Sequence, residues 1–120
     1  MRTRRVHYLV WHEDDIKKLL VFTNCPLVKQ FAYVKHQGDS DQYPHYHFYF
    51  VISGSDEFLF KLNGVDDRYC VDCLAKENDI INYFLRSPYG CEVDLQSFKT
   101  NIEGYKKYNG ISRINNKNGV

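Results

Sequence analysis

A chain of 120 residues, 43% hydrophobic and 26% charged, has the size and composition of one soluble globular domain. Its net charge of +1 excludes a basic surface over the whole molecule, so any nucleic-acid binding must come from a local patch. Four irregularly spaced cysteines exclude a secreted disulfide framework, and no apolar run suits a signal peptide or a membrane helix. We therefore expect a soluble protein of the reducing cytoplasm with no membrane partner.

The first half of the chain predicts a strand, a helix and a β-hairpin. A run of β-forming residues predicts a strand over Arg4 to Trp11. Acidic residues in a first turn, followed by apolar residues at helical spacing, predict a helix over Glu13 to Phe22. Strands are expected over Phe31 to His36 and over Pro44 to Ile52, and the polar segment 37–43 between them predicts a hairpin.

The second half of the chain predicts three helices and a strand. Ser55 can cap a short helix that ends at about Leu62, and Arg68 to Cys73 is expected to be a strand. Helical spacing of apolar residues predicts a helix over Lys76 to Leu85 and a last helix over Ser97 to Tyr108.

The order of these elements, βαββαβα followed by the last helix, predicts an α+β fold. An antiparallel sheet with helices packed on one of its faces, of the ferredoxin-like kind, fits this order. A chain of this length forms one core, so we expect a single domain over residues 1–112, followed by a polar C-terminal tail over residues 113–120.

Two histidines one residue apart, His45 and His47, lie in the aromatic run YPHYHFYF of the third predicted strand. Side chains alternate along a strand, so both imidazoles face the same side of the sheet and can share a cation. His36 and Gln37 end the neighbouring strand of the hairpin, from where a third ligand can reach across. The alternative is a pair of half-buried histidines bonded to backbone or water.

The predicted helix DIINYFLR places three polar side chains on one face. Asp79, Tyr83 and Arg86 are spaced i, i+4 and i+7. The residues between them, Ile80, Ile81, Phe84 and Leu85, supply apolar packing. Taken alone, Tyr83 is expected to lie at the core edge of a plain amphipathic helix.

Together, the segments VHYLVWH, YPHYHFYF and NYFLR have the order and rough spacing of the three motifs of the HUH endonucleases. Over about Val6 to Arg86, the chain resembles the replication-initiator (Rep) nucleases of small single-stranded DNA viruses and rolling-circle plasmids. The resemblance implies that His45 and His47 bind a divalent ion, Mn²⁺ or Mg²⁺, and that Tyr83 is the nucleophile.

This chain departs from the pattern of the family at two places. Many relatives have lysine three residues after the tyrosine, where this chain has Arg86; arginine is suited to holding a phosphate rather than to moving a proton. Many relatives also have an acidic metal ligand at the end of the strand before the histidine pair. The candidates here are His36 and Gln37, unless Asp39 or Asp41 folds in, and an all-nitrogen set favours a metal softer than magnesium, such as manganese.

The resemblance implies sequence-specific nicking and joining of single-stranded DNA at a replication origin, in the cytoplasm of a host cell. The intermediate would be a 5′-phosphotyrosine beside a free 3′-hydroxyl. We expect no helicase in this chain, and a homodimer is one way in which a single tyrosine per subunit could complete the reaction. Arg4 and Arg5 are candidate phosphate contacts, with ordinary solvated charge as the alternative.

Other interpretations remain open. A single-stranded DNA transposase of the same superfamily would use Tyr105 or Tyr108, and a non-catalytic module would stack bases on its aromatic side chains. The pair Cys70 and Cys73 invites a zinc interpretation, but buried free thiols are expected instead. The two remaining histidines, His7 and His12, are expected to be structural or surface residues rather than ligands.

Overall fold

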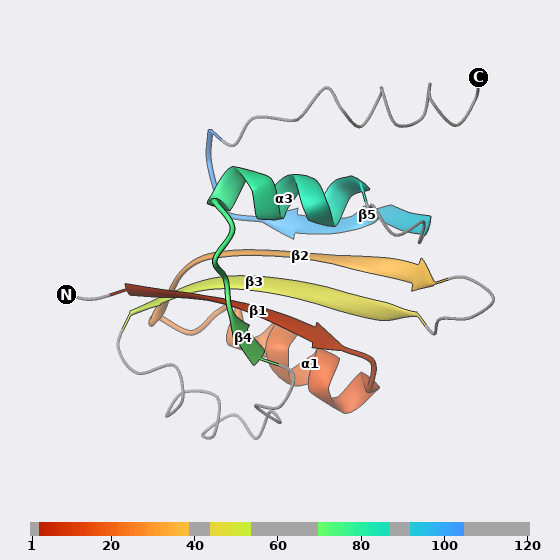
Figure 1. Cartoon of the computed structure of the whole chain (residues 1–120). Helices are drawn as coiled ribbons and strands as arrows, with labels where there is room; N and C mark the ends of the chain where they lie inside the picture. The colour runs from red at the N-terminus through yellow and green to blue at the C-terminus, as the bar shows by residue number, and fades with distance from the viewer. Residues whose placement is uncertain (1–2, 39–43, 54–69, 87–91, 105–120) are drawn as a thin grey trace.

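A single antiparallel sheet organises the described part of the chain. The computed structural model describes residues 3–38, 44–53, 70–86 and 92–104. Within these ranges five strands follow the order β4-β1-β3-β2-β5, and two helices pack against them (Figure 1). The predicted helix of residues 55–62 and the predicted tail lie outside the described residues, so the domain boundaries stay a prediction.

The first half of the chain forms the centre of the sheet. Strand β1 (Thr3–Val10) leads into α1 (Glu13–Phe22), and β2 (Val28–Gly38) and β3 (His45–Ser53) follow. Both β1 and β2 are antiparallel to β3, which lies between them. This is a split βαβ unit, so the α+β architecture is confirmed and is compatible with a ferredoxin-like fold. The predicted helix Glu13 to Phe22 and the predicted hairpin are also confirmed.

The second half adds a strand to each edge of this sheet and a helix that connects them along the chain. The short strand β4 (Cys70–Asp72) pairs with β1, the helix α3 (Glu77–Arg86) follows, and β5 (Glu92–Thr100) pairs with the free edge of β2. Neither described helix is long and apolar enough to cross a membrane.

The predicted last helix is wrong in its described part, because residues 97–100 belong to β5. Strand β2 has an edge that β3 does not pair, and backbone groups along such an edge need partners. Strand β5 supplies them with an irregular register, in which Ser97 bridges the gap. Its hydroxyl accepts a hydrogen bond from the Lys35 backbone nitrogen at 2.7 Å and donates one to the Asp94 carbonyl at 2.6 Å.

The expectation that the helices share one face of the sheet is also wrong. Figure 1 shows α1 and α3 on opposite sides of the sheet. The cause is β3, in which eight of nine residues are buried. Phe48 and Phe50 pack with α1, whereas Tyr49 and Val51 pack with α3. A strand that is apolar on both faces needs cover on both.

Candidate metal centre

Three histidines converge on the α3 side of the sheet. His36 lies directly opposite His45 in the β2–β3 register, and His47 lies one step along the same face, opposite Val34. One ring nitrogen from each of the three histidines lies within 4.8 Å of the other two. All three side chains are buried, with exposed fractions of 2% for His36, 7% for His45 and 4% for His47. The prediction that His45 and His47 share a face is confirmed, and His36 joins them.

A hydrogen bond to the end of α3 orients His36. Its Nε2 lies 2.9 Å from the carbonyl oxygen of Phe84 and can only donate to it. That carbonyl belongs to the last turn of α3, and four residues further on stands Pro88, which has no N–H to donate. The imidazole therefore supplies a hydrogen-bond donor to a carbonyl of this last turn. With Nε2 protonated, Nδ1 of His36 keeps the lone pair that a cation would use.

His7 supports the cluster from β1, a role that the sequence did not reveal. Its Nε2 lies 2.9 Å from Nδ1 of His47, and the two rings stack with centroids 5.1 Å apart. If His47 holds a cation through Nε2, its Nδ1 carries the proton and donates it to His7. The sequence showed only that His7 belongs to the first strand. The register that pairs His7 with Tyr49, on the face of the cluster, came from the structure.

Three histidines at this site, His7, His36 and His47, have a pKa below the ordinary value of histidine. Burial, followed by repulsion from His36, lowers the pKa of His7 to about 4. Burial and the neighbouring imidazoles, His36 first, lower the pKa of His47 to about 2. Burial also lowers the pKa of His36, against the opposing effect of its bond to Phe84. Neutral imidazoles at physiological pH have lone pairs available for a metal ion.

These pKa values predict that the metal-free protein loses stability in mild acid. A histidine in the unfolded chain titrates near 6.5, so the unfolded state binds more protons than the folded state as the pH falls below that value. The free energy of unfolding should therefore decrease between pH 7 and pH 5, by about 2 kcal/mol for each of His7 and His47. Urea unfolding in a chelator at the two pH values measures this change. Equal or greater stability at pH 5 would contradict it.

The candidate nucleophile lies beside the cluster. The rings of Tyr83 and His47 meet edge to face, with centroids 5.6 Å apart at 85°, and the centroid of His7 lies 6.3 Å from that of Tyr83. Tyr83 is partly exposed, as the predicted core-edge position requires. On the same helix face Asp79 is exposed and Arg86 is partly exposed. The structure thus brings together a phenol and an imidazole cluster that lie far apart in the sequence.

Two hydrogen bonds fix α3 over the sheet. Near its start, the hydroxyl of Tyr49 on β3 donates to the Glu77 carboxylate at 2.8 Å. Near its end, His36 on β2 donates to Phe84. Because both anchors come from the strands that carry the cluster, the position of Tyr83 relative to the histidines is set from both ends of its helix.

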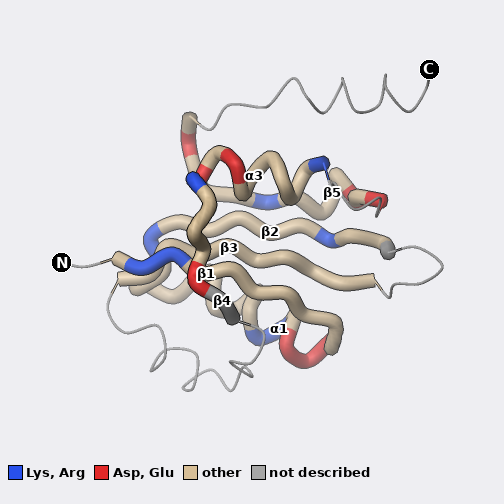
Figure 2. The backbone as a smooth tube through the Cα atoms, in the orientation of Figure 1, with Lys and Arg blue, Asp and Glu red and all other residues tan. Residues whose placement is uncertain are grey.

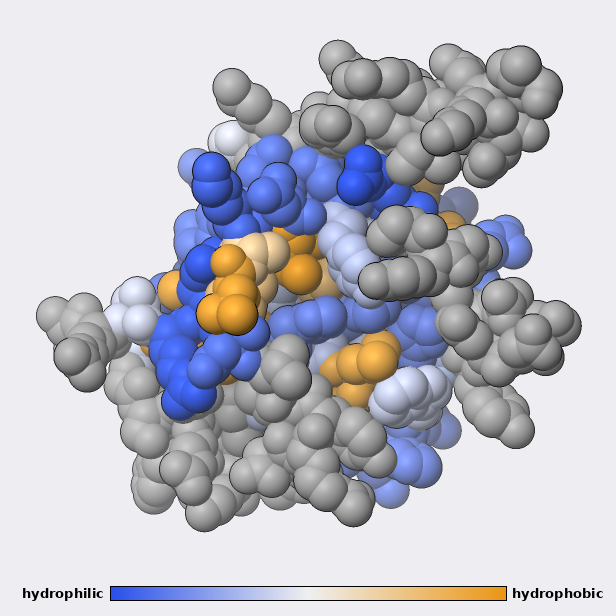
Figure 3. Space-filling view, viewed as in Figure 1, coloured by the Kyte–Doolittle hydropathy of each residue, from blue (hydrophilic) through white to orange (hydrophobic). Residues whose placement is uncertain are grey.

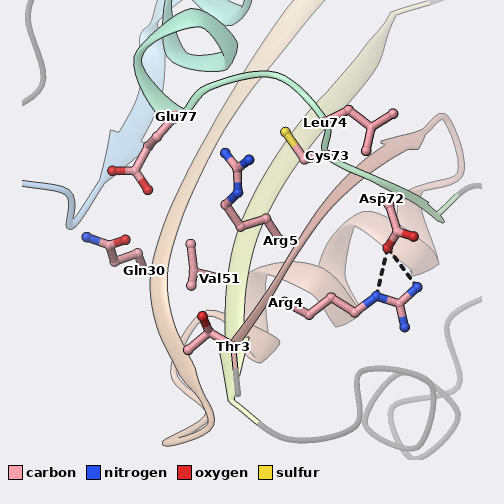
Figure 4. A pocket seen from close by; sticks show the side chains of 9 residues that line it. All are labelled: Thr3, Arg4, Arg5, Gln30, Val51, Asp72, Cys73, Leu74 and Glu77. Carbon is pink, nitrogen blue, oxygen red and sulfur yellow. Dashed lines mark hydrogen bonds and ion pairs between the residues drawn. The ribbon is translucent and has the colours of Figure 1, made fainter. Parts of the chain in front are cut away.

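The other predicted site residues lie apart from the cluster. Gln37 is exposed, whereas its neighbour His36 is buried, so His36 is the residue that the strand presents to the pair. Arg4 and Arg5 line a pocket of about 430 Å³ at the start of β1 (Figure 4). Arg4 pairs with Asp72 at 2.7 Å, and Arg5 donates to the Ala75 carbonyl at 2.6 Å. Asp39 and Asp41 lie outside the described residues.

The two cysteines whose side chains are described, Cys25 and Cys73, do not contribute to this centre. Cys73 is buried and free, as expected, and burial raises the pKa of its thiol. The side chain of Cys70 is outside the described residues. Charged side chains are spread over several elements rather than gathered on one face, although Lys and Arg occupy the start of β1 (Figure 2). This distribution agrees with the small net charge of the chain.

The chain matches no protein-family model, no curated protein and no solved structure. The chemistry of the site therefore has to be inferred from the donor set itself. Three imidazoles without a carboxylate suit a first-row transition metal better than Mg²⁺, which prefers oxygen ligands. His36, His45 and His47 would hold such an ion, and the orientations of His36 and His47 are already constrained by Phe84 and His7, respectively.

Replacement of His7 tests its support of His47. In His7→Leu the Nδ1 proton of His47 loses its acceptor, so the dissociation constant for Mn²⁺ should rise by roughly 10- to 100-fold. In His7→Gln the amide oxygen can accept the same proton, and part of the affinity should return. Calorimetric titration with Mn²⁺ measures both variants. Equal affinity in His7→Leu and the wild-type protein would show that the contact has no role in metal binding.

Proposed function

We propose that this chain is a metal-dependent nuclease that nicks and joins single-stranded DNA, with Tyr83 as its nucleophile. The observation that carries the proposal is the contact between Tyr83 and His47 within a cluster of three histidines. The resemblance to Rep nucleases of the HUH superfamily, noted in the sequence, supports the same conclusion. The fold is compatible with that superfamily, since its sheet presents the histidine pair on a central strand.

The reaction is a transesterification at phosphorus. The Tyr83 oxygen attacks in line, a new bond joins it to the 5′-phosphate, and the bond to the 3′-oxygen breaks. The phenol loses its proton and the departing 3′-oxygen gains one, so a 3′-hydroxyl is released. A bound divalent ion would polarise the phosphoryl oxygen and help the phenol to ionise. Because the product is again a phosphodiester, the reverse attack by the 3′-hydroxyl rejoins the strand.

The substrate is unpaired DNA at a replication origin of a virus or plasmid, reached in the host cytoplasm. A paired strand cannot bend into a site that lies between a helix and a sheet, so strand separation must precede cutting. We assign to Arg86, three residues after Tyr83, the holding of a phosphate through its guanidinium, since arginine is poorly suited to transferring protons. A second subunit or a water molecule then completes the cycle.

Incubation of labelled single-stranded oligonucleotides with the protein and Mn²⁺ tests the proposal. A denaturing gel should show a covalent protein–DNA adduct and a shortened strand, both absent when a chelator is added. A duplex of the same sequence should give neither product. Binding of the strand without any adduct, over a panel of origin sequences and divalent ions, would support a non-catalytic nucleic-acid module instead.

A further inference from the structure

A second pocket, of about 370 Å³, lies at the hairpin end of the sheet and shares His45 with the histidine cluster. Its apolar wall comes from α1, through Ile16 and Leu20, and its other side from Trp11 and Tyr46. The volume is within the range of sites that bind small organic groups. Apolar colour on the face shown in Figure 3 is confined to small islands within a hydrophilic surface. The pocket at Trp11 thus combines apolar walls with a residue of the candidate metal centre, His45.

Trp11 gives the pocket a planar surface next to the cluster. Its ring centroid lies 6.2 Å from that of His45, and 40% of the residue is exposed. Tryptophan combines a large flat apolar ring with a polar N–H, so a partly exposed tryptophan can offer a planar surface to a ligand. Base stacking on an aromatic face is the commonest way in which proteins hold unpaired nucleotides.

The charged residues that line the pocket include two lysines and one carboxylate. These are Lys35, Lys17 and Glu13. The ammonium of Lys35 forms no ion pair or hydrogen bond with the described residues, whereas Lys17 makes an exposed pair with Glu13 at 3.4 Å. The Trp11 ring can stack on the base of a nucleotide. The Lys35 ammonium, which has no partner among the described residues, can contact the phosphate of the same nucleotide.

The pocket at the start of β1 lacks this combination. Both of its arginines are already bonded, Arg4 to Asp72 (Figure 4) and Arg5 to the Ala75 carbonyl. Its apolar lining includes Val51 and Leu74, which are aliphatic side chains rather than rings. Between the two pockets, the one at Trp11 is the better nucleotide site.

We infer that the Trp11 pocket binds one unpaired base of the DNA strand next to the scissile phosphate. The base stacks on Trp11, and Lys35 contacts the adjoining phosphate. The inference rests on the proposed nicking function for its choice of ligand, and it adds a residue-level basis for substrate recognition. The pocket lies against α1 and the cluster on the α3 side of the sheet, and the two meet at His45, the first residue of β3, so the DNA strand would pass around this end of the sheet to reach both.

Fluorescence of Trp11 tests the pocket without any cleavage, because the chain contains a single tryptophan. The full chain carrying Tyr83→Phe is titrated in chelator with oligodeoxythymidine or oligodeoxyadenosine. Saturable quenching by at least one of the two single strands is expected, and little quenching by their duplex. With a dye-labelled strand, Trp11→Ala should weaken binding by roughly 5- to 100-fold, the loss expected for one base–aromatic stack.

Salt dependence tests the lysine separately. Lys35→Ala should lower the slope of log affinity against log salt by about 0.7, the value for one phosphate contact on a single strand, and Lys35→Arg should restore it. Lys29→Ala is the matched control, because Lys29 lies on the same strand but outside the pocket. Equal slopes for Lys35→Ala and the parent protein would show that Lys35 does not contact a phosphate.

The outcomes separate this inference from the proposed function. If the labelled strand binds while Trp11 fluorescence stays unchanged, the inference that this pocket binds a base is wrong. An adduct formed by the wild-type protein would then still support the nuclease proposal. Quenching without any adduct supports the pocket and counts against the nuclease. Equal quenching by duplex and single strand also overturns the inference, since a stacked base pair cannot present a free ring to Trp11.

Discussion

Replacement of Tyr83 by phenylalanine is expected to abolish the covalent protein–DNA adduct, with a loss of about 10³-fold or more in the nicking rate. The ring would stay in its contact with His47, so the packing of α3 should not change. What disappears is the phenolic oxygen, without which no phosphotyrosine can form. Single-turnover cleavage of a labelled single strand in Mn²⁺ measures the loss, and thermal unfolding verifies that the variant folds.

Three control variants make this result specific to Tyr83. Tyr33→Phe removes a hydroxyl from a half-buried tyrosine that stacks on Phe31, on the other side of the sheet, and should cleave at the wild-type rate. Tyr105→Phe and Tyr108→Phe test the arrangement expected of a transposase, which would use one of these tyrosines as its nucleophile. Both residues lie outside the described part of the chain. Loss of the adduct in either of them, with Tyr83→Phe still active, would exclude Tyr83 as the nucleophile.

Replacement of His45 by glutamine is expected to remove the stabilisation that a metal gives to the folded protein. A ligand that binds only the folded state at about 100 times its dissociation constant stabilises it by about 2.7 kcal/mol. For a domain of this size that corresponds to an increase of roughly 10 °C in Tm. Mn²⁺ should produce such an increase in the wild-type protein and little or none in His45→Gln. Mg²⁺ should be less effective than Mn²⁺ in the wild-type protein, because all three ligands are imidazoles.

The matched control for this prediction is His12→Gln. His12 is an exposed histidine just before α1 and lies outside the cluster, so this variant should respond to Mn²⁺ as the wild-type protein does. Differential scanning calorimetry with and without a chelator gives both values. A wild-type protein whose Tm is insensitive to Mn²⁺, Co²⁺ and Zn²⁺ alike would mean that the three histidines do not form a metal site.

Local patterns were sufficient to predict the elements that depend on local chemistry. The acidic first turn and helical spacing of residues 13–22 predicted the bounds of α1, and the alternation of β3 placed His45 and His47 on one face. The apolar spacing of α3 likewise predicted which of its residues are buried and left Tyr83 at the edge. These features are decided within a few residues, so no knowledge of the rest of the chain was needed.

Long-range partners decided what the sequence did not predict. Residues 97–100 have a helical pattern, but the free edge of β2 recruits them into a strand. His7 has no neighbour in the sequence that marks it, because its partner His47 is forty residues away. The choice of His36 over Gln37 depended on which residue of β2 the hairpin register sets opposite His45. Register and sheet order are tertiary properties, and the periodicity of one segment does not contain them.

The central claim is that an imidazole-held cation and the phenol of Tyr83 meet at one phosphorus atom. Crystals grown with Mn²⁺, measured at a wavelength where manganese scatters anomalously, test it most directly. We predict one strong anomalous peak bonded to ring nitrogens of His36, His45 and His47, with the Tyr83 hydroxyl facing the ion. A peak elsewhere, or three histidines that stay bonded only to protein and water at saturating Mn²⁺, would contradict the account.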